Sequence, residues 1–117
     1  MATRTVLYEP SADVVFIGTD VKVAFTPSAT GFDIDYDEWS VEIKYGSNET
    51  AYKTFTREDM IVEQNPKGEN VYSVILDTTN MVGTVTATVR VRIPDSNCEG
   101  GIRKEVAKFD LFKVYQT

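Results

Sequence analysis

Carboxylate side chains recur at alternate positions in one short stretch, at Asp33, Asp35 and Asp37, and Glu38 follows directly. A hard cation such as Ca²⁺ needs several carboxylates converging on one point, and two carboxylates at a fixed separation can hydrolyse a glycoside. The spacing matches the first three ligand positions of an EF-hand calcium loop. The match ends there, because the sixth position should be Gly and is Glu38, and the twelfth should be Glu and is Lys44.

The acidic stretch also has a structural interpretation. Ile34 and Tyr36 alternate with the aspartates, as in an edge-like segment that faces water and whose charges oppose aggregation between sheets. Catalysis would require one carboxyl group with a raised pKa, which local sequence does not indicate. The sequence therefore favours an acidic lead-in to a strand that begins near Trp39. A looser sandwich-loop calcium site on the three aspartates is the alternative.

Other reactive groups are sparse. The chain has no histidine, so it lacks both a Ser-His or Cys-His nucleophile pair and the commonest zinc ligand. The single cysteine, Cys98, follows Asn97 in a polar loop and precedes Glu99, whose negative charge would raise the thiol pKa. Gly100 and Gly101 form a turn rather than a phosphate-binding loop. We expect no enzymatic activity, no catalytic residue and no cofactor.

Length and composition place the chain among globular proteins. Its 117 residues, 42% hydrophobic and 26% charged, suit one domain over residues 1–117. No apolar run reaches the roughly 20 residues that cross a bilayer, and residues 1–16 lack the layout of a signal peptide. We expect no membrane partner and synthesis in a cytoplasm. A single cysteine cannot form an internal disulfide, which is compatible with such a reducing compartment.

The charge is acidic and uneven. The net charge is −6; residues 1–70 carry 6 basic and 13 acidic side chains, whereas residues 71–117 carry 6 basic and 5 acidic ones. Nucleic-acid binding proteins present a basic surface to phosphates. Nucleic acid is therefore not an expected partner.

Apolar residues recur with a period of two, which predicts strands. The period is clear over 21–25, 39–45, 70–77 and 83–93, and Pro66-Lys67-Gly68 predicts a hairpin turn. The last strand, within 102–115, changes phase, which predicts a bulge near Val106-Ala107 or burial on both faces. Residues 56–60 could form at most one helical turn. About seven short antiparallel strands predict an all-β, immunoglobulin-like sandwich, with a small barrel as the alternative.

One strand presents a polar face that could bind a partner. In residues 83–93 the apolar side chains point one way, and the other face carries Thr84 and four further residues, Thr86, Thr88, Arg90 and Arg92. Arginine suits interfaces because its guanidinium is weakly hydrated and pairs with carboxylates in two-point contacts. These last four residues are a candidate partner interface. The alternative is a solvated sheet face, which is common in antiparallel sheets.

Two stretches resemble short virion proteins of tailed bacteriophages and prophages of gut Bacteroidota. The first, residues 72–114, has Asp77-Thr78-Thr79 at a strand end, a glycine-led strand from Gly83, Pro94-Asp95, an acidic glycine-containing loop, an Arg-x-Glu element and a closing apolar strand. The second is an acidic run leading into a tryptophan strand, "DIDYDEWSVEI". The resemblance covers about half of the chain.

The resemblance implies an immunoglobulin-like structural domain on a phage particle, made in the host cytoplasm. A capsid decoration or head-fibre component is favoured, with other virion proteins as partners. A tail or baseplate adaptor, or a carbohydrate-binding module for host attachment, is the alternative. The resemblance transfers no catalytic residues, and it leaves self-association and the location on the particle open.

Overall fold

The computed structural model describes residues 6–10, 14–27 and 31–116, and its ordered elements are almost entirely strands. Two single turns of 3-10 helix, η1 (Arg57–Asp59) and η2 (Glu99–Gly101), interrupt them. The described strands are β1 (Val6–Pro10), β2 (Val14–Phe16), β3 (Asp20–Pro27), β4 (Glu38–Tyr45), β5 (Thr50–Thr56), β6 (Ile61–Gln64), β7 (Asn70–Asp77), β8 (Gly83–Pro94) and β9 (Ile102–Tyr115).

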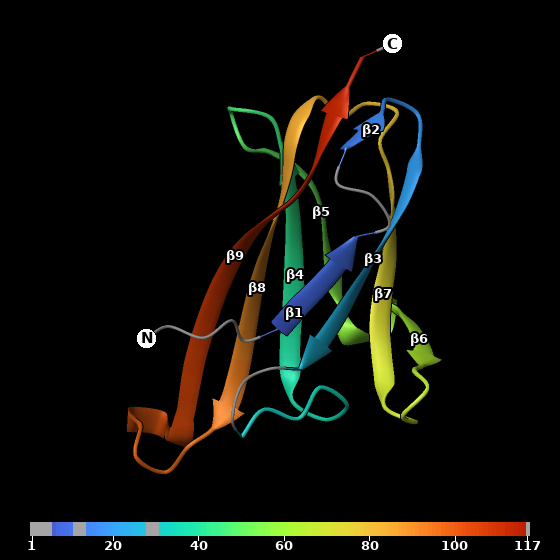
Figure 1. The fold of residues 1–117 in the computed structure, drawn as a ribbon. Helices are drawn as coiled ribbons and strands as arrows, with labels where there is room; N and C mark the ends of the chain where they lie inside the picture. Colours follow the sequence, from blue (N-terminus) through green and yellow to red (C-terminus); the bar gives the residue numbers. More distant parts are fainter. Residues whose placement is uncertain (1–5, 11–13, 28–30, 117) are drawn as a thin grey trace.

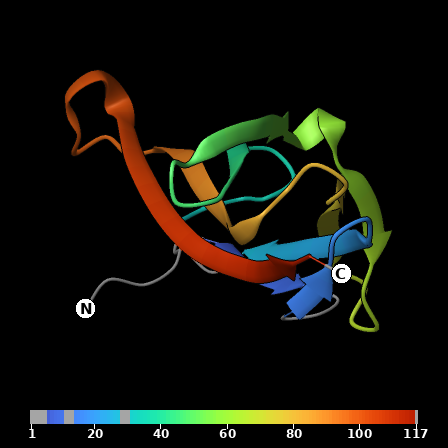
Figure 2. The same cartoon turned by 90° about the horizontal axis from the view of Figure 1, so that it is seen from above.

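The strands form two sheets that pack face to face (Figures 1 and 2). The first has the order β1-β3-β7-β6 and the second the order β2-β9-β8-β4-β5. All pairings are antiparallel except that of β2 with β9. The four-stranded order corresponds to the ABED sheet of an immunoglobulin domain, and β4, β8 and β9 correspond to its C, F and G strands. The predicted all-β, immunoglobulin-like sandwich is confirmed.

The number of strands is higher than predicted. Nine strands are described where about seven were expected, and the three-residue β2 and the polar β5 lack the alternation that marks the others. Residues 57–59 form a single 3-10 turn, in keeping with the prediction of at most one helical turn there. The predicted hairpin turn at Pro66-Lys67-Gly68 joins β6 to β7, and Gly68 has the positive φ of 82° that favours glycine.

Trp39 is buried in the core between the sheets, at the second position of β4. It is 3% exposed, and its ring makes edge-to-face contacts with Phe25 of β3, Phe32 and Tyr72 of β7 at centroid distances of 6.3, 6.2 and 5.7 Å. Aromatic pairs of this geometry add to the stabilisation that burial alone supplies. This aromatic cluster packs among buried aliphatic side chains of both sheets, so the core holds together without a disulfide.

The phase change in β9 is a bulge, but its predicted position was wrong. Thr86 of β8 pairs with Asp110, whereas the preceding Val85 pairs with Phe112, so Leu111 is the extra residue. The bulge allows Leu111 and Phe112 to be buried in succession. Val106 needs no bulge, because it is 64% exposed on the outer face of the sheet.

The Asp77-Thr78-Thr79 element has a structural role. Thr78 is fully buried; its hydroxyl donates to the carbonyl of Thr19 at 2.7 Å and accepts from the amide of Gly18 at 3.0 Å. The carboxylate of Asp77 accepts from the amide and the hydroxyl of Thr79. These bonds tie the end of β7 to the turn between β2 and β3, and they satisfy a buried polar group.

Candidate functional site

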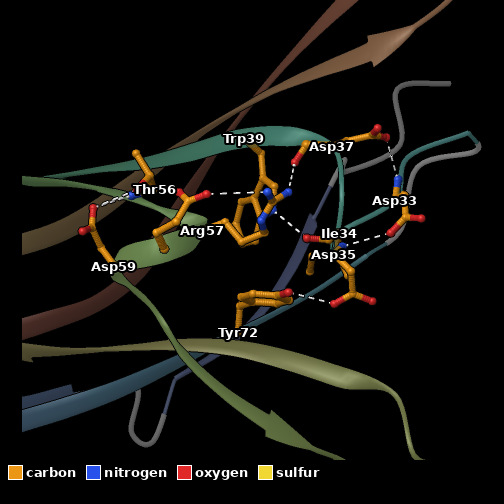
Figure 3. A network of polar contacts seen from close by, with 10 residues as sticks. Asp33, Ile34, Asp35, Asp37, Trp39, Thr56, Arg57, Asp59 and Tyr72 are labelled. Carbon is orange, nitrogen blue, oxygen red and sulfur yellow. Dashed lines mark hydrogen bonds and ion pairs between the residues drawn. The ribbon is translucent and has the colours of Figure 1, made fainter.

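The acidic stretch is a hydrogen-bonded corner (Figure 3). The amide of Asp33 donates to Oδ2 of Asp37 at 2.8 Å, and the amide of Asp35 donates to Oδ1 of Asp33 at 3.0 Å. Two carboxylates are therefore used to close the turn that precedes β4. Short polar side chains commonly stabilise turns through such local bonds.

The side chain of Asp35 points in a different direction, toward β7 of the four-stranded sheet. Its Oδ1 accepts hydrogen bonds from the hydroxyl of Tyr72 at 2.7 Å and from the side-chain amide of Asn70 at 3.0 Å, both on β7. Next to it, the carbonyl of Ile34 accepts a bond from the indole nitrogen of Trp39 at 3.0 Å. The corner thus fixes both the buried tryptophan and the packing of β4 against β7 (Figure 3).

The candidate calcium ligands do not converge. Asp33 and Asp37 bond within the turn, while Asp35 bonds to β7. Among the described residues, no group of three or more His, Cys, Asp or Glu side chains is placed to hold a metal ion. Ca²⁺ binds where six to eight oxygen ligands surround it, and this corner does not assemble such a set.

We predict that Asp35→Ala lowers the free energy of unfolding by about 1–3 kcal/mol, because it removes the acceptor of the partly buried hydroxyl of Tyr72. Urea denaturation measures the change. The matched control is Asp20→Ala, which removes an exposed aspartate at the start of β3 and should change stability by about 0.5 kcal/mol or less. Equal effects of the two substitutions would contradict a structural role for Asp35.

Burial, together with the hydrogen bond to Asp35, raises the pKa of Tyr72 from 10.0 to about 12. The folded state therefore favours the neutral phenol more than the unfolded state does. The resulting stabilisation is complete below about pH 10 and is lost as the pH rises toward 12.

We predict that the free energy of unfolding of the native protein falls between about pH 10 and 12, by on the order of 3 kcal/mol from this group. Tyr72→Phe should be less stable at neutral pH, because it loses the bond to Asp35, but its stability should fall less steeply in that window. Urea denaturation at a series of pH values measures both slopes. An equally steep fall in the variant would exclude Tyr72 as the group responsible.

The predicted interface residues lie on the outer face of the five-stranded sheet, on its central strand β8. Arg90 and Arg92 are exposed, while Thr86 and Thr88 are half-buried by neighbouring side chains. Strand register places Arg90 between Ser40 of β4 and Val106 of β9. The two arginines therefore lie on an outward-facing surface, and the two threonines continue it toward the other end of β8.

An open hollow of about 590 Å³ occupies the end of this face nearest the acidic corner. Arg90 and Arg92, with Lys104 and Val106 of β9, line one side of it. The opposite side is lined by Tyr36 in the turn before β4, by Glu38 at the start of β4, and by Arg57 and Glu58 of η1. This sheet-face hollow brings the two candidate regions of the sequence together, because Glu38 ends the acidic stretch and forms an ion pair with Arg92 at 3.7 Å.

The side chains of the sheet-face hollow are available to a partner. Tyr36 is 82% exposed and Val106 is 64% exposed, and solvent-exposed apolar groups surrounded by arginine are typical of protein-binding surfaces. The pair Arg92–Glu38 at 3.7 Å is solvent-exposed, and the pair Arg90–Glu42 at 3.3 Å is partly exposed, so both hold the arginines weakly. A partner could therefore replace either pair at little cost.

Arg57 fixes the far side of the sheet-face hollow. Its Nη1 donates to the carbonyl of Asp37 at 2.7 Å, which joins η1 to the acidic corner (Figure 3). The turn itself is held by Asp59, whose Oδ2 accepts from the amide and the hydroxyl of Thr56 at 3.0 Å. The same bonds lower the pKa of Asp59, because they favour its charged form.

Several described strand edges are protected against pairing with another chain. A register shift between Ile43 and Lys44 interrupts the pairing of β4 with the edge strand β5. Lys53 of β5 lies opposite the buried Ile43 and so places a charge on the inner side of that edge. The edge strands β6 and β2 have only four and three residues. Bulges, inward charges and short strands all discourage edge pairing, which favours the sheet face as the binding surface.

Sequence reasoning did not assign five of the residues that line the sheet-face hollow to a site: Tyr36, Arg57, Glu58, Lys104 and Val106. The signal for Val106 was present, since its alternation placed it on the same face as Lys104 and Lys108, where an apolar side chain is unexpected. Arg57 gave no such signal, because its position depends on how η1 folds back onto the acidic corner.

No family model matches the sequence, and no curated protein shows a significant match to it. Within the described ranges, no helix is long and apolar enough to span a membrane.

Proposed function

We propose that this protein is a non-enzymatic structural component of a bacteriophage particle, an immunoglobulin-like module that binds other particle proteins through the sheet-face hollow. The observation that carries the binding role is the exposure of Tyr36 and Val106 beside Arg90 and Arg92 on one face. The assignment to a phage particle rests on the resemblance of residues 72–114 to virion proteins. Within the particle, we favour a role as a capsid decoration protein or as a component of a head fibre.

Assembly on a repetitive particle makes a modest contact sufficient. Many copies bind a surface on which the same contact recurs, so the effective affinity exceeds that of one interface. The exposed side chains of Arg90 and Arg92 suit such a contact, because charged groups on a binding surface guide association and select the partner.

The test is mass spectrometry of purified particles of the phage or prophage that encodes this protein, with immunogold labelling to locate it. We expect the protein in clean particles, with gold on the heads. Gold confined to tails would retain a virion role and move the protein to an adaptor position. Absence from clean particles would overturn the proposal.

A carbohydrate-binding module for host attachment is the second candidate. It is favoured by exposed aromatic side chains, which can stack on sugar rings: Tyr36 at the hollow, and Phe16 and Tyr115 at paired positions of β2 and β9. Binding on a glycan array, with and without Ca²⁺, would support it. Absence of the protein from particles together with glycan binding that Tyr36→Ala removes would establish it over the first candidate.

A further inference from the structure

The exposed charged side chains around the sheet-face hollow are separated by sign; Glu105 of β9 also lines the hollow, but it is half-buried and pairs with Arg103. Arg90 and Arg92 of β8 and Lys104 of β9 form its basic side. Glu38 and Glu58 provide exposed carboxylates on its other side. Arg57, on the acidic side, is already bound to the carbonyl of Asp37 and pairs with Glu58 at 3.6 Å. The exposed apolar residues divide in the same way, since Tyr36 lies beside the carboxylates and Val106 beside the cations.

The basic side carries a local electrostatic cost. Arg92 and Lys104 are cross-strand partners on the same outward face, and like charges opposite one another destabilise a sheet. Lys104 makes no ion pair with any described residue, and the single ion pair of Arg92 is the long, exposed contact with Glu38. An incoming carboxylate would relieve this repulsion.

The separation of charges restricts what can bind. A uniformly acidic surface would be repelled by Glu38 and Glu58, and a uniformly basic one by Arg90, Arg92 and Lys104. A fitting partner presents both signs in the complementary arrangement, with an apolar group on each side. A second copy of this chain, turned by half a revolution about an axis through the hollow, has that arrangement. A two-fold interface uses the same surface of both copies, so the basic side of each copy faces the acidic side of the other.

We propose that the sheet-face hollow is a two-fold dimer interface in which the cations of one copy meet the carboxylates of the other. Glu38 and Glu58 of each copy approach Arg90, Arg92 and Lys104 of the partner copy. Tyr36 of one copy packs toward Val106 of the other. The inference rests on the proposed binding role of this face and specifies its first partner.

Sedimentation equilibrium of the purified protein tests the dimer. We expect the native chain to be dimeric at about 100 µM, a concentration at which a dimer of micromolar affinity is formed. Arg90→Glu with Arg92→Glu makes the hollow largely acidic, and Glu38→Lys with Glu58→Lys makes it largely basic. Each double variant alone should be mostly monomeric at this concentration, which corresponds to an affinity reduced by about a thousandfold.

Mixing the two variants supplies the decisive result. An equimolar mixture should recover a dimer, because the acidic hollow of one variant complements the basic hollow of the other. Lys22→Glu with Lys67→Glu, which matches the charge change of the first variant on the four-stranded sheet side, should dimerise as the native chain does. Thermal melts establish that each variant is folded.

Three results would overturn the dimer: a monomeric native chain, a dimer insensitive to both double variants, or monomeric variants that fail to associate when mixed. The proposed function is tested separately by particle incorporation. A monomeric native chain whose Arg90→Glu, Arg92→Glu variant is still lost from particles would show that the hollow binds a different particle protein.

Discussion

Replacing Trp39 with alanine is expected to lower the free energy of unfolding by about 3–5 kcal/mol, the largest effect of any substitution considered. The buried indole contacts the rings of Phe25, Phe32 and Tyr72, and its nitrogen donates a hydrogen bond to the carbonyl of Ile34. Alanine would leave a cavity and release the acidic corner. Because the free energy of unfolding of a native protein is only about 5–15 kcal/mol, this variant should be close to unfolding at 37 °C.

Urea denaturation with near-ultraviolet circular dichroism measures this loss. Tyr36→Ala is the matched control, since it removes a neighbouring aromatic ring that is 82% exposed and should change stability by about 0.5 kcal/mol or less. A loss below about 1 kcal/mol for Trp39→Ala would mean that the sandwich does not depend on the aromatic cluster.

Reversing the charge of both Arg90 and Arg92 to Glu is expected to reduce incorporation into particles at least tenfold, while the melting temperature stays within about 3 °C of the native value. Both side chains are exposed on the outer face, so the fold has little need of them. The two substitutions make the charge of each copy more negative by four units, so a partner surface that complements the arginines would be repelled. Quantitative mass spectrometry of purified particles measures the change.

The control for this variant is Lys22→Glu with Lys67→Glu, which changes the net charge equally on strand β3 and the β6–β7 turn. It should enter particles at the native level. Equal losses from both variants would show that net charge, rather than the sheet-face hollow, governs assembly. Native incorporation of the Arg90, Arg92 variant would remove the hollow from the proposed function.

The core was predictable because it depends on alternation. Val85, Val89 and Val91 are fully or almost fully buried, as a period of two requires of a strand with one solvated face. The same alternation placed Arg90 and Arg92 outward correctly. It failed in β9, where Leu111 is an extra residue: a bulge reverses the phase, and local sequence indicated that it occurs but gave the wrong position.

The site depends on contacts that sequence spacing does not contain. Asp33, Asp35 and Asp37 alternate as calcium ligands would, but hydrogen bonds with Tyr72 and Asn70 draw Asp35 toward β7. The sheet-face hollow likewise combines β8 and β9 with η1, and that combination follows from strand register and from the turn after β5. Such long-range contacts decided which of several plausible chemistries the residues support.

Site-specific photo-crosslinking in assembled particles tests the central claim, binding through the sheet-face hollow, most directly. A photoreactive amino acid would replace Val106 in the hollow or, as the matched control, Ile75 on the outer face of the four-stranded sheet, which is 50% exposed. We predict a specific crosslink from position 106, to a second copy or to another particle protein, and none from position 75. Crosslinks from position 75 alone, or from neither position in particles that contain the protein, would contradict the account.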